Sequence, residues 1–258
     1  MSFGSPRQKI LITGASGGLG GALARYYAAP GVHLALWGRD PARLSAVAEA
    51  CRQSGASVDV RSLDISDVAW AAQAIVAEDL ARQIDMAFLS SGLGDVRAEG
   101  DKVEDPALVG KLGIINFAAP AAMAAALAGR MADRRAGCIV LIGSAAAFHA
   151  LPFAAAYSGS KAGLARFAEA LRLGTREYGV RVTLVSPGFI DTAAGRKVPG
   201  PKPLMLKPED VAARIARAAE QGKAHAIMPW PFAVLRLFDR LLPRFLRDWL
   251  LLSLAPPR

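Results

Sequence analysis

Short apolar runs alternate along the chain with longer segments whose apolar residues recur every three or four positions. The short runs are typical of buried strands in a parallel sheet, and the longer periodic segments are typical of helices packed on it. The expected strands are residues 9–13, 32–37, 57–63, 84–89, 138–144, 181–186 and 225–228. The expected helices are residues 19–27, 41–54, 67–80 with Asp67 as N-cap, 106–134 with an interruption at Pro120, 154–170 and 208–221. This alternation predicts a doubly wound, Rossmann-like parallel sheet in a single three-layer α/β/α domain.

Composition narrows the class of protein. The 258 residues suit one α/β domain, and residues 1–9 lack the apolar core of a secretory signal. Cys51 and Cys138 lie far apart, and neither has a cysteine or histidine at ligand spacing. We therefore expect reduced thiols, a cytoplasmic protein and no metal site. The net charge of +9 suits a phosphorylated cofactor, an acidic substrate or an anionic membrane surface, whereas dispersed basic residues argue against nucleic acid.

A glycine-rich turn follows the first expected strand. Residues 14–20 read Gly-Ala-Ser-Gly-Gly-Leu-Gly and lead directly into the first helix. A strand, a glycine turn and a helix start together place backbone N–H groups and the positive end of the helix against a pyrophosphate. The alternative is an ordinary tight turn between a strand and a helix. Four glycines in seven residues favour the dinucleotide site.

The end of the second expected strand indicates which dinucleotide binds. Gly38 stands where an NAD site normally has a carboxylate for the ribose 2′-hydroxyl, and Arg39 follows it. A guanidinium without that carboxylate suits a 2′-phosphate, so we expect NADP(H) in preference to NAD(H). Arg43, one helical turn further on, is placed to help. Two alternatives remain: Asp40 reaches the ribose instead, or Arg39 is an ordinary solvated charge.

The candidate chemistry lies in residues 157–161, Tyr-Ser-Gly-Ser-Lys. Side chains four residues apart share one face of a helix, so the Tyr157 phenol and the Lys161 ammonium can meet over one substrate. A nearby cation lowers the pKa of a phenol and makes it a usable acid and base. Ser144 ends an apolar strand, where α/β sheets bind ligands. The tyrosine and lysine alone also fit a solvated helix face.

With these pieces in place, the chain resembles the short-chain dehydrogenase/reductase family over about residues 9–229. Residues 13–20 match its TGxxxGxG loop, residues 187–192 look like its PG motif, and Asp64 with Ile65 looks like its adenine-contacting pair. Its catalytic tetrad matches Asn116, Ser144, Tyr157 and Lys161. The full set of expected cofactor contacts is Gly14, Ser16, Gly18, Leu19, Gly20, Arg39, Asp64, Ile65, Gly92, Tyr157, Lys161, Pro187, Gly188, Ile190 and Thr192.

The resemblance implies an NADP(H)-dependent oxidoreductase that interconverts a carbonyl and an alcohol. Tyr157 would transfer the proton and Ser144 would hold the substrate oxygen. Lys161 would lower the Tyr157 pKa and bind the nicotinamide ribose, while Asn116 would position a water. An alternative for Asn116 is that it satisfies a break in its own helix. Residues 89–92 depart from the family because Leu-Ser-Ser-Gly replaces Asn-Asn-Ala-Gly, and we expect weaker support for the neighbouring strand ends.

Other classes of function fit the same fold. A cofactor-sensing or scaffolding protein without catalysis is one, because fold does not fix function. An epimerase or dehydratase using the same tyrosine is another, although the chain is short for such enzymes. Small residues near 118–128 and 154–170 suit a homodimer or homotetramer.

Three further segments bear on the substrate and the surroundings. Residues 145–153 are apolar and favour a hydrophobic substrate, and residues 189–206 look like a mobile lid. We expect residues 1–229 to form the catalytic domain and 230–258 an amphipathic helical extension, broken near Pro243. Its arginines at 236, 240, 244 and 247 would form one cationic stripe. We expect this extension to pack on the substrate pocket or a second subunit, with a membrane interface as the alternative.

Overall fold

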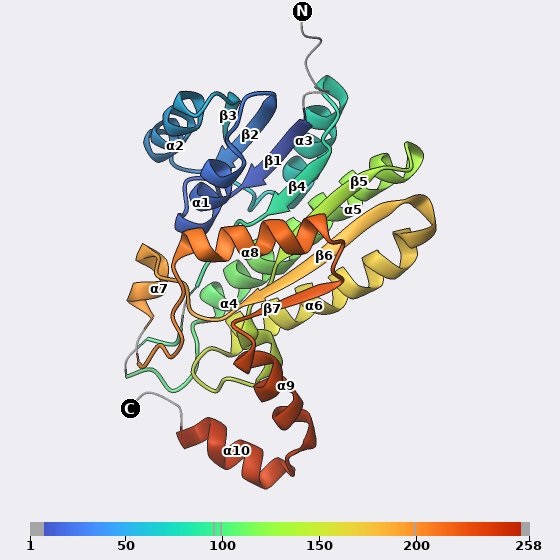
Figure 1. Cartoon of the computed structure of the whole chain (residues 1–258). Coiled ribbons are helices and arrows are strands. Elements are labelled where there is room, and N and C mark those ends of the chain that lie inside the picture. The colour runs from blue at the N-terminus through green and yellow to red at the C-terminus, as the bar shows by residue number, and fades with distance from the viewer. Residues whose placement is uncertain (1–7, 95, 99, 199, 254–258) are drawn as a thin grey trace, which may run out of the picture.

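The computed structural model describes residues 8–94, 96–98, 100–198 and 200–253, apart from the side chains of residues 238–240. Within this part of the chain, seven parallel strands form one sheet in the order β3-β2-β1-β4-β5-β6-β7 (Figure 1). The strands are β1 (Gln8–Thr13), β2 (Val32–Gly38), β3 (Ser57–Ser62), β4 (Met86–Leu89), β5 (Gly137–Ile142), β6 (Val180–Pro187) and β7 (His225–Met228). The expected doubly wound parallel sheet is confirmed.

Helices cover both faces of the sheet (Figure 1). The α-helices are α1 (Gly18–Tyr27), α2 (Pro41–Gln53), α3 (Val68–Ala81), α4 (Pro106–Gly113), α5 (Ala119–Asp133), α6 (Ala155–Thr175), α7 (Ala193–Lys197), α8 (Pro208–Glu220), α9 (Pro231–Leu241) and α10 (Arg244–Ser253). The shorter turns are a π-helix η1 (Ile114–Ala118) and two 3₁₀-helices, η2 (Ala145–Phe148) and η3 (Arg176–Tyr178).

Two apolar cores lie on opposite sides of the sheet, because successive strand residues point to opposite faces. In β1, Leu11 packs in the cluster under α3, α5 and α6, whereas Ile10 and Ile12 pack under α1, α2 and α8. All three side chains are fully buried. The continuous apolar runs seen in the sequence are therefore strands covered on both faces.

Three helices begin at an aspartate whose carboxylate accepts a backbone N–H of the first turn. Asp40 accepts from Arg43 N at 3.0 Å, Asp67 from Trp70 N at 2.9 Å and Asp105 from Ala107 N at 3.0 Å. Such caps satisfy amide groups that have no partner within the helix. They fix where α2, α3 and α4 start, and the expected N-cap at Asp67 is confirmed.

The run Pro106–Asp133 is helical throughout but widens into the π-turn η1. Pro120 has no N–H to donate to the carbonyl of Asn116, four residues earlier, which explains an irregular turn at this point. Within the described residues, this is the one helix long and apolar enough to cross a membrane, and 56% of its most apolar window is buried inside the fold. It packs against α3 and α6, so we interpret it as a core helix.

The C-terminal segment forms two helices, α9 and α10, separated at residues 242–243. The expected break near Pro243 is therefore present. The expected single stripe of arginines is not, because Arg236 turns inward and bonds His225 of β7, whereas Arg244 is exposed. Residues 1–7 and 254–258, which belong to the two expected parts of the chain, lie outside the described residues.

Candidate active site

The order of the strands reverses between β1 and β4, and the candidate site lies at the carboxyl ends of these two strands. Open α/β sheets bind ligands in the crevice at such a point. Gly14 follows β1 with φ +67°, and a Cβ added there would lie 2.9 Å from Ser91 N. Only glycine tolerates both the left-handed backbone and this close approach.

The glycine turn folds tightly into α1. A Cβ on Gly20 would lie 2.3 Å from the Gly14 carbonyl oxygen, so the turn packs against the helix start. The N-cap of α1 is Gly17, whose missing side chain leaves the first-turn amides uncapped. Uncapped amides at a helix N-terminus, preceded by a turn of small residues, fit a pyrophosphate.

Thr192, from the segment after β6, closes over this turn. A Cβ on Gly18 would lie 2.5 Å from the Thr192 methyl carbon Cγ2. The Thr192 hydroxyl accepts from Gly195 N at 3.0 Å and caps α7. An isolated bridge between Ile190 and Leu206 holds the two ends of this segment together. The fold thus brings the glycine turn and the Pro187–Gly188 region to one place, as expected from the sequence.

Arg39 and Asp40, which follow the end of β2, have different surroundings. The Asp40 carboxylate accepts a hydrogen bond from Arg43 N and caps α2, whereas the Arg39 side chain is exposed. A Cβ on Gly38 would lie 2.8 Å from Ser16 Oγ, so β2 ends directly against the glycine turn. The exposed Asp64 accepts from Ser66 N at 2.9 Å; this bond and the nearby Arg39 charge lower the pKa of its carboxyl.

Ile65, which follows Asp64, is buried in the apolar core under α3. The expected adenine-contacting pair therefore has one exposed and one buried member.

Serine links replace the asparagine that the family usually has after β4. The Ser90 hydroxyl donates to the Thr13 carbonyl, and Ser91 N donates to Thr13 Oγ1 at 3.2 Å. The ends of β1 and β4 are therefore joined by two hydrogen bonds. A hydroxyl at this position thus reaches the carbonyl of the neighbouring strand, and the expectation that this support is weaker than that of an asparagine stays a prediction.

Asn116 holds the loop after β4. Its Oδ1 accepts from Leu93 N at 2.8 Å and its Nδ2 donates to Leu93 O at 2.9 Å. The side chain is fully buried and also lies 3.4 Å from Ser160 Oγ. The amide thus bonds a separate segment, so the alternative in which it satisfies its own helix is wrong. Beside it, a Cβ on Gly92 would lie 3.2 Å from Asn116 Oδ1 and 3.4 Å from Lys161 Nζ.

Lys161 and Ser144 lie at the carboxyl end of β5. The Lys161 ammonium donates to the Ile142 carbonyl at 2.9 Å and is 5% exposed. Burial lowers the pKa of Lys161 to about 8, because the charged form loses hydration. Ser144 accepts from Ala146 N at 3.1 Å and thereby begins η2.

Tyr157 interacts with Ser144 from the first turn of α6. Burial raises the pKa of the Tyr157 phenol, and the hydrogen-bonding contribution of Ser144 opposes that rise. The Lys161 ammonium donates to the Ile142 carbonyl, and the expected lowering of the Tyr157 pKa by Lys161 stays a prediction.

Sequence reasoning missed Ser160 as part of this cluster. Its hydroxyl donates to the Tyr157 carbonyl at 2.8 Å and lies next to the Asn116 amide. Ser160 is buried. The signal available in the sequence was its spacing, because a serine three residues after Tyr157 lies next to that residue on the surface of the helix.

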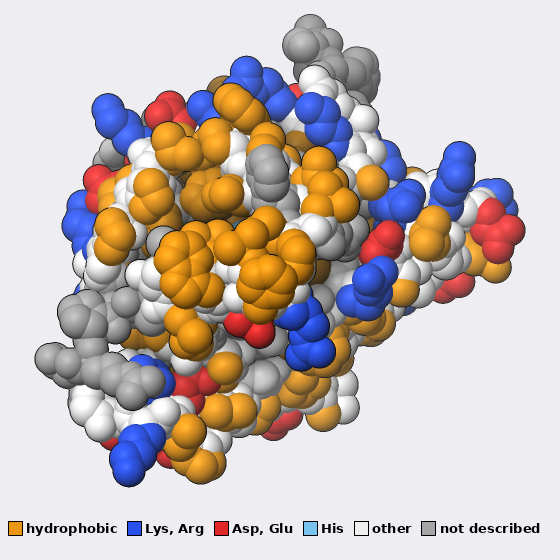
Figure 2. Space-filling model, turned by 90° about the horizontal axis from the view of Figure 1, so that it is seen from below, with side chains coloured by type: hydrophobic (Ala, Val, Ile, Leu, Met, Phe, Trp, Pro, Cys, Tyr) orange, Lys and Arg blue, Asp and Glu red, His pale blue; other side chains and the backbone are white. Residues whose placement is uncertain are grey.

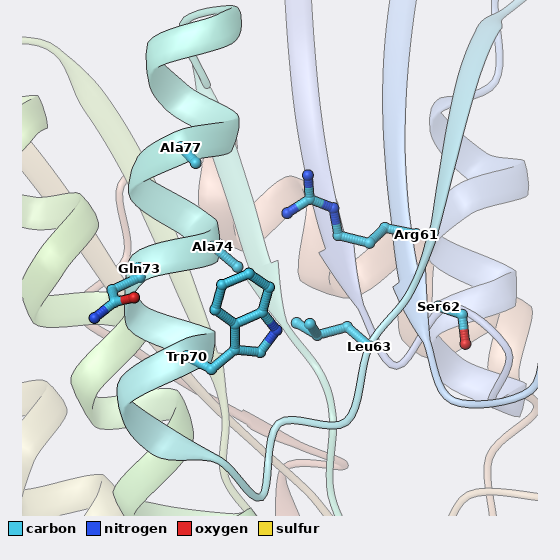
Figure 3. A pocket seen from close by; sticks show the side chains of 7 residues that line it. All are labelled: Arg61, Ser62, Leu63, Trp70, Gln73, Ala74 and Ala77. Carbon is cyan, nitrogen blue, oxygen red and sulfur yellow. The ribbon is translucent and has the colours of Figure 1, made fainter.

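A hollow of about 470 Å³ lies away from this cluster, beside β3 and α3 (Figure 3). It is lined by Arg61, Ser62, Leu63, Trp70, Gln73, Ala74 and Ala77. Arg61 lies over the Trp37 ring at 5.3 Å and 3.9 Å from Glu78, so its charge is already engaged. None of the tetrad residues lines this hollow, so we place the chemistry at the β1, β4 and β5 ends instead.

Known proteins are similar to this chain in sequence. A sequence model of the short chain dehydrogenases matches residues 8–201. An uncharacterized oxidoreductase of Myxococcus xanthus is 32% identical over 245 residues, covering 92% of this chain and 94% of the relative. One from Mycobacterium tuberculosis is 35% identical over 243 residues, with the same coverage of 92% and 94%.

Solved structures give the same result. A short-chain dehydrogenase of Sphingobium yanoikuyae in complex with NADPH has a TM-score of 0.80 at 25% identity, covering 97% of this chain and 98% of that one. A short-chain dehydrogenase of Mycobacterium paratuberculosis bound to NAD has a TM-score of 0.75 at 22% identity, covering 85% and 95%, and shows the shared fold. The chain belongs to the short-chain dehydrogenase family of oxidoreductases.

Proposed function

We propose that the protein is an NADP(H)-dependent oxidoreductase that interconverts a carbonyl and an alcohol on a hydrophobic substrate. The observation that supports this most strongly is the convergence of three groups at the end of β5. Lys161 bonds the last residue of that strand, Ser144 follows it by two residues, and Tyr157 interacts with Ser144. These are the groups that a proton transfer to a substrate oxygen requires.

Tyr157 acts as the general acid and base, and Ser144 holds the substrate oxygen. The raised pKa of Tyr157 keeps the phenol protonated at neutral pH, so it can donate to a carbonyl oxygen during reduction. A bound nicotinamide would supply or accept the hydride. The apolar segment at residues 145–153 supports a hydrophobic substrate, because it follows Ser144 directly.

Lys161 and Asn116 both lie beside Gly92, where an added Cβ would meet Asn116 Oδ1 at 3.2 Å and Lys161 Nζ at 3.4 Å. Lys161 holds the cofactor ribose and supplies positive charge beneath the phenol. Asn116 positions the loop after β4 through both backbone groups of Leu93. The proposal keeps the relay water that the family resemblance implies, and places it near Asn116 in η1.

The cofactor is NADP(H) in this proposal. Arg39 is exposed at the end of β2, and the Asp40 carboxylate is bound to the start of α2. One oxygen of the Asp40 carboxylate is therefore engaged at the helix start, and the exposed Arg39 guanidinium would bind the 2′-phosphate. The glycine turn and Thr192 would hold the pyrophosphate.

Measuring the loss of NADPH or NADH absorbance across ketones, aldehydes and acyl compounds tests the proposal. We expect oxidation of NADPH by at least one apolar carbonyl compound, and slower oxidation of NADH. Tight NADPH binding without oxidation across the panel would favour a cofactor sensor. Conversion of an epimer with no net change in absorbance would favour an epimerase.

Two further expectations stay predictions. A homodimer or homotetramer is one. The small residues of α5 that suggested it, including Ala121, Ala124 and Ala128, are buried within the chain itself. Packing between subunits would therefore use the outer apolar side chains of this region, such as Val109, Ile114 and Phe117. Cytoplasmic residence is the other, supported by two free, buried cysteines.

A further inference from the structure

Helices α9 and α10 turn their apolar faces away from the protein. In α9, Val234, Leu237 and Leu241 follow one another on one face, and Leu237 is 57% exposed. In α10, Phe245 and Trp249 are 76% and 65% exposed. Surface helices normally bury the apolar face and expose the charged one. In α9 and α10 these apolar side chains are exposed instead.

The inward face of α9 is fixed by specific contacts. Arg236 NH1 lies 3.2 Å from His225 Nδ1, and its guanidinium carbon lies 5.0 Å from the centre of the Phe148 ring. His225 Nε2 in turn lies 2.9 Å from Ser186 Oγ. Rotating α9 to bury its apolar face would break these contacts. The contacts therefore hold α9 in the orientation that exposes its apolar face.

Packing at the start of α9 supports the same orientation. A Cβ on Gly188 would lie 2.4 Å from the Phe232 ring, so this ring lies against the end of β6. In α10, Leu251 is the inward residue and is 7% exposed. Both helices therefore contact the rest of the protein through other residues, while their apolar faces stay exposed.

We propose that the outward faces of α9 and α10 dock on an anionic lipid surface. Viewed from below, apolar side chains form a broad area, with lysines and arginines and some acidic side chains at its margins (Figure 2). Among the described side chains of these helices, the carboxylate of Asp248 lies 3.4 Å from Arg247, so its charge is offset within α10. Apolar faces flanked by basic side chains are the pattern of helices that lie in a membrane interface.

Aromatic residues and helix lengths suit this position. Trp230 and Trp249 are both exposed, and tryptophan prefers the boundary between headgroups and acyl chains. The helices have 11 and 10 residues. Each is about 15 Å long, half the bilayer core of about 30 Å, so both lie in the surface and neither spans it.

A second copy of the chain fits the face less well. Two-fold pairing would place the basic margin of one copy next to the same margin of the other, in a protein of net charge +9. Anionic headgroups complement these charges, whereas a second copy repels them. The docking proposal stands independently of the proposed enzymatic activity.

Flotation of the full chain with vesicles tests the proposal. We expect it to float with phosphatidylcholine vesicles that contain phosphatidylglycerol, and to float less without that lipid or at high salt. Replacing three outward residues, in L237Q/F245Q/W249Q, should weaken the binding by at least about tenfold. The matched control W70Q/L80Q/L173Q removes three exposed apolar side chains from α3 and α6 and should leave binding unchanged.

Fluorescence locates the contact. Brominated lipids should quench tryptophan emission of the wild type, and the variant W230F/W249F should lose that quenching while still floating. Absence of flotation in the wild type, or undiminished flotation of L237Q/F245Q/W249Q, would overturn the proposal. A triple variant that converts a dimer into a monomer while its lipid binding stays unchanged would assign the face to a second copy instead.

Discussion

The side-chain amide of Asn116 bonds both the N–H and the carbonyl of Leu93. These two residues come from η1 and from the loop after β4, so one buried amide fixes the loop that borders Lys161. Asn116 lies within the π-turn η1, four residues before Pro120. The irregular turn that accompanies Pro120 therefore contains the residue that holds the loop.

Replacing Asn116 by alanine should loosen this loop. Two partly buried backbone groups of Leu93 would lose their partner, at a cost of about 1–3 kcal/mol in the free energy of unfolding. We expect a lower Tm and a higher KM for NADPH, measured by calorimetry and steady-state kinetics. The control Ser160→Ala removes the 3.4 Å contact to Asn116 and the 2.8 Å hydrogen bond to the Tyr157 carbonyl of its own helix, but leaves both bonds to Leu93 in place, so it should cost less. Equal losses in both variants would contradict the clamp.

Lys161→Met should stabilise the protein while it abolishes turnover. The folded pKa of Lys161 is about 8 against an ordinary 10.5, so the buried ammonium costs about 3 kcal/mol at neutral pH. Between pH 8 and 10.5 the unfolded chain holds a proton that the folded chain lacks, and this cost disappears as the pH rises. We therefore expect a higher Tm for the variant at pH 7 and a smaller difference near pH 10.

Lys9 provides the contrast. It is also buried, but its ammonium lies 2.8 Å from the Glu78 carboxylate. Lys9→Met should lower the Tm, because it leaves a carboxylate without its partner. A Lys161→Met variant that is as destabilised as Lys9→Met at pH 7 would contradict the account of Lys161.

Gly18 and Thr192 should show coupled effects on cofactor binding. Gly18→Ala places a methyl group 2.5 Å from Thr192 Cγ2, so we expect weaker NADPH binding. Thr192→Ser removes that methyl carbon but keeps the hydroxyl that caps α7. The double variant should regain part of the lost affinity in fluorescence titrations. Strictly additive losses would show that the two residues do not meet.

Arg39→Ala tests the choice of cofactor. Loss of one charge-assisted hydrogen bond of about 1.5–3 kcal/mol should raise the KM for NADPH by about tenfold or more, and leave the KM for NADH nearly unchanged. Arg176→Ala removes the same charge from an exposed residue just before β6, at the opposite end of the sheet, and serves as the control. A similar KM increase for both cofactors would argue against a 2′-phosphate contact.

The sequence predicted those parts of the fold that depend on local patterns. Continuous apolar runs marked the strands, and Asp67 marked the start of α3, because both signals lie within a few residues of their effect. The contact between Gly18 and Thr192 joins segments far apart in the chain, and only their resemblance to known motifs suggested it.

Contacts between distant segments explain what sequence reasoning got wrong. The spacing of the four tail arginines does not tell whether each side chain points outward or inward. The Arg236 side chain points inward because it bonds His225. The hydrogen bond from Ser90 to the Thr13 carbonyl depends on how β1 and β4 pair, which local sequence does not show. The Tyr157 pKa likewise depends on burial that spacing does not reveal.

The central claim is that Tyr157 transfers the proton, and comparing wild type with Tyr157→Phe tests it most directly. The measurements are single-turnover oxidation of NADPH with an active carbonyl substrate and NADPH binding by fluorescence. We predict that the variant loses turnover by at least about a hundredfold while its NADPH affinity stays within a few-fold. Turnover at a rate comparable to the wild type would contradict the account.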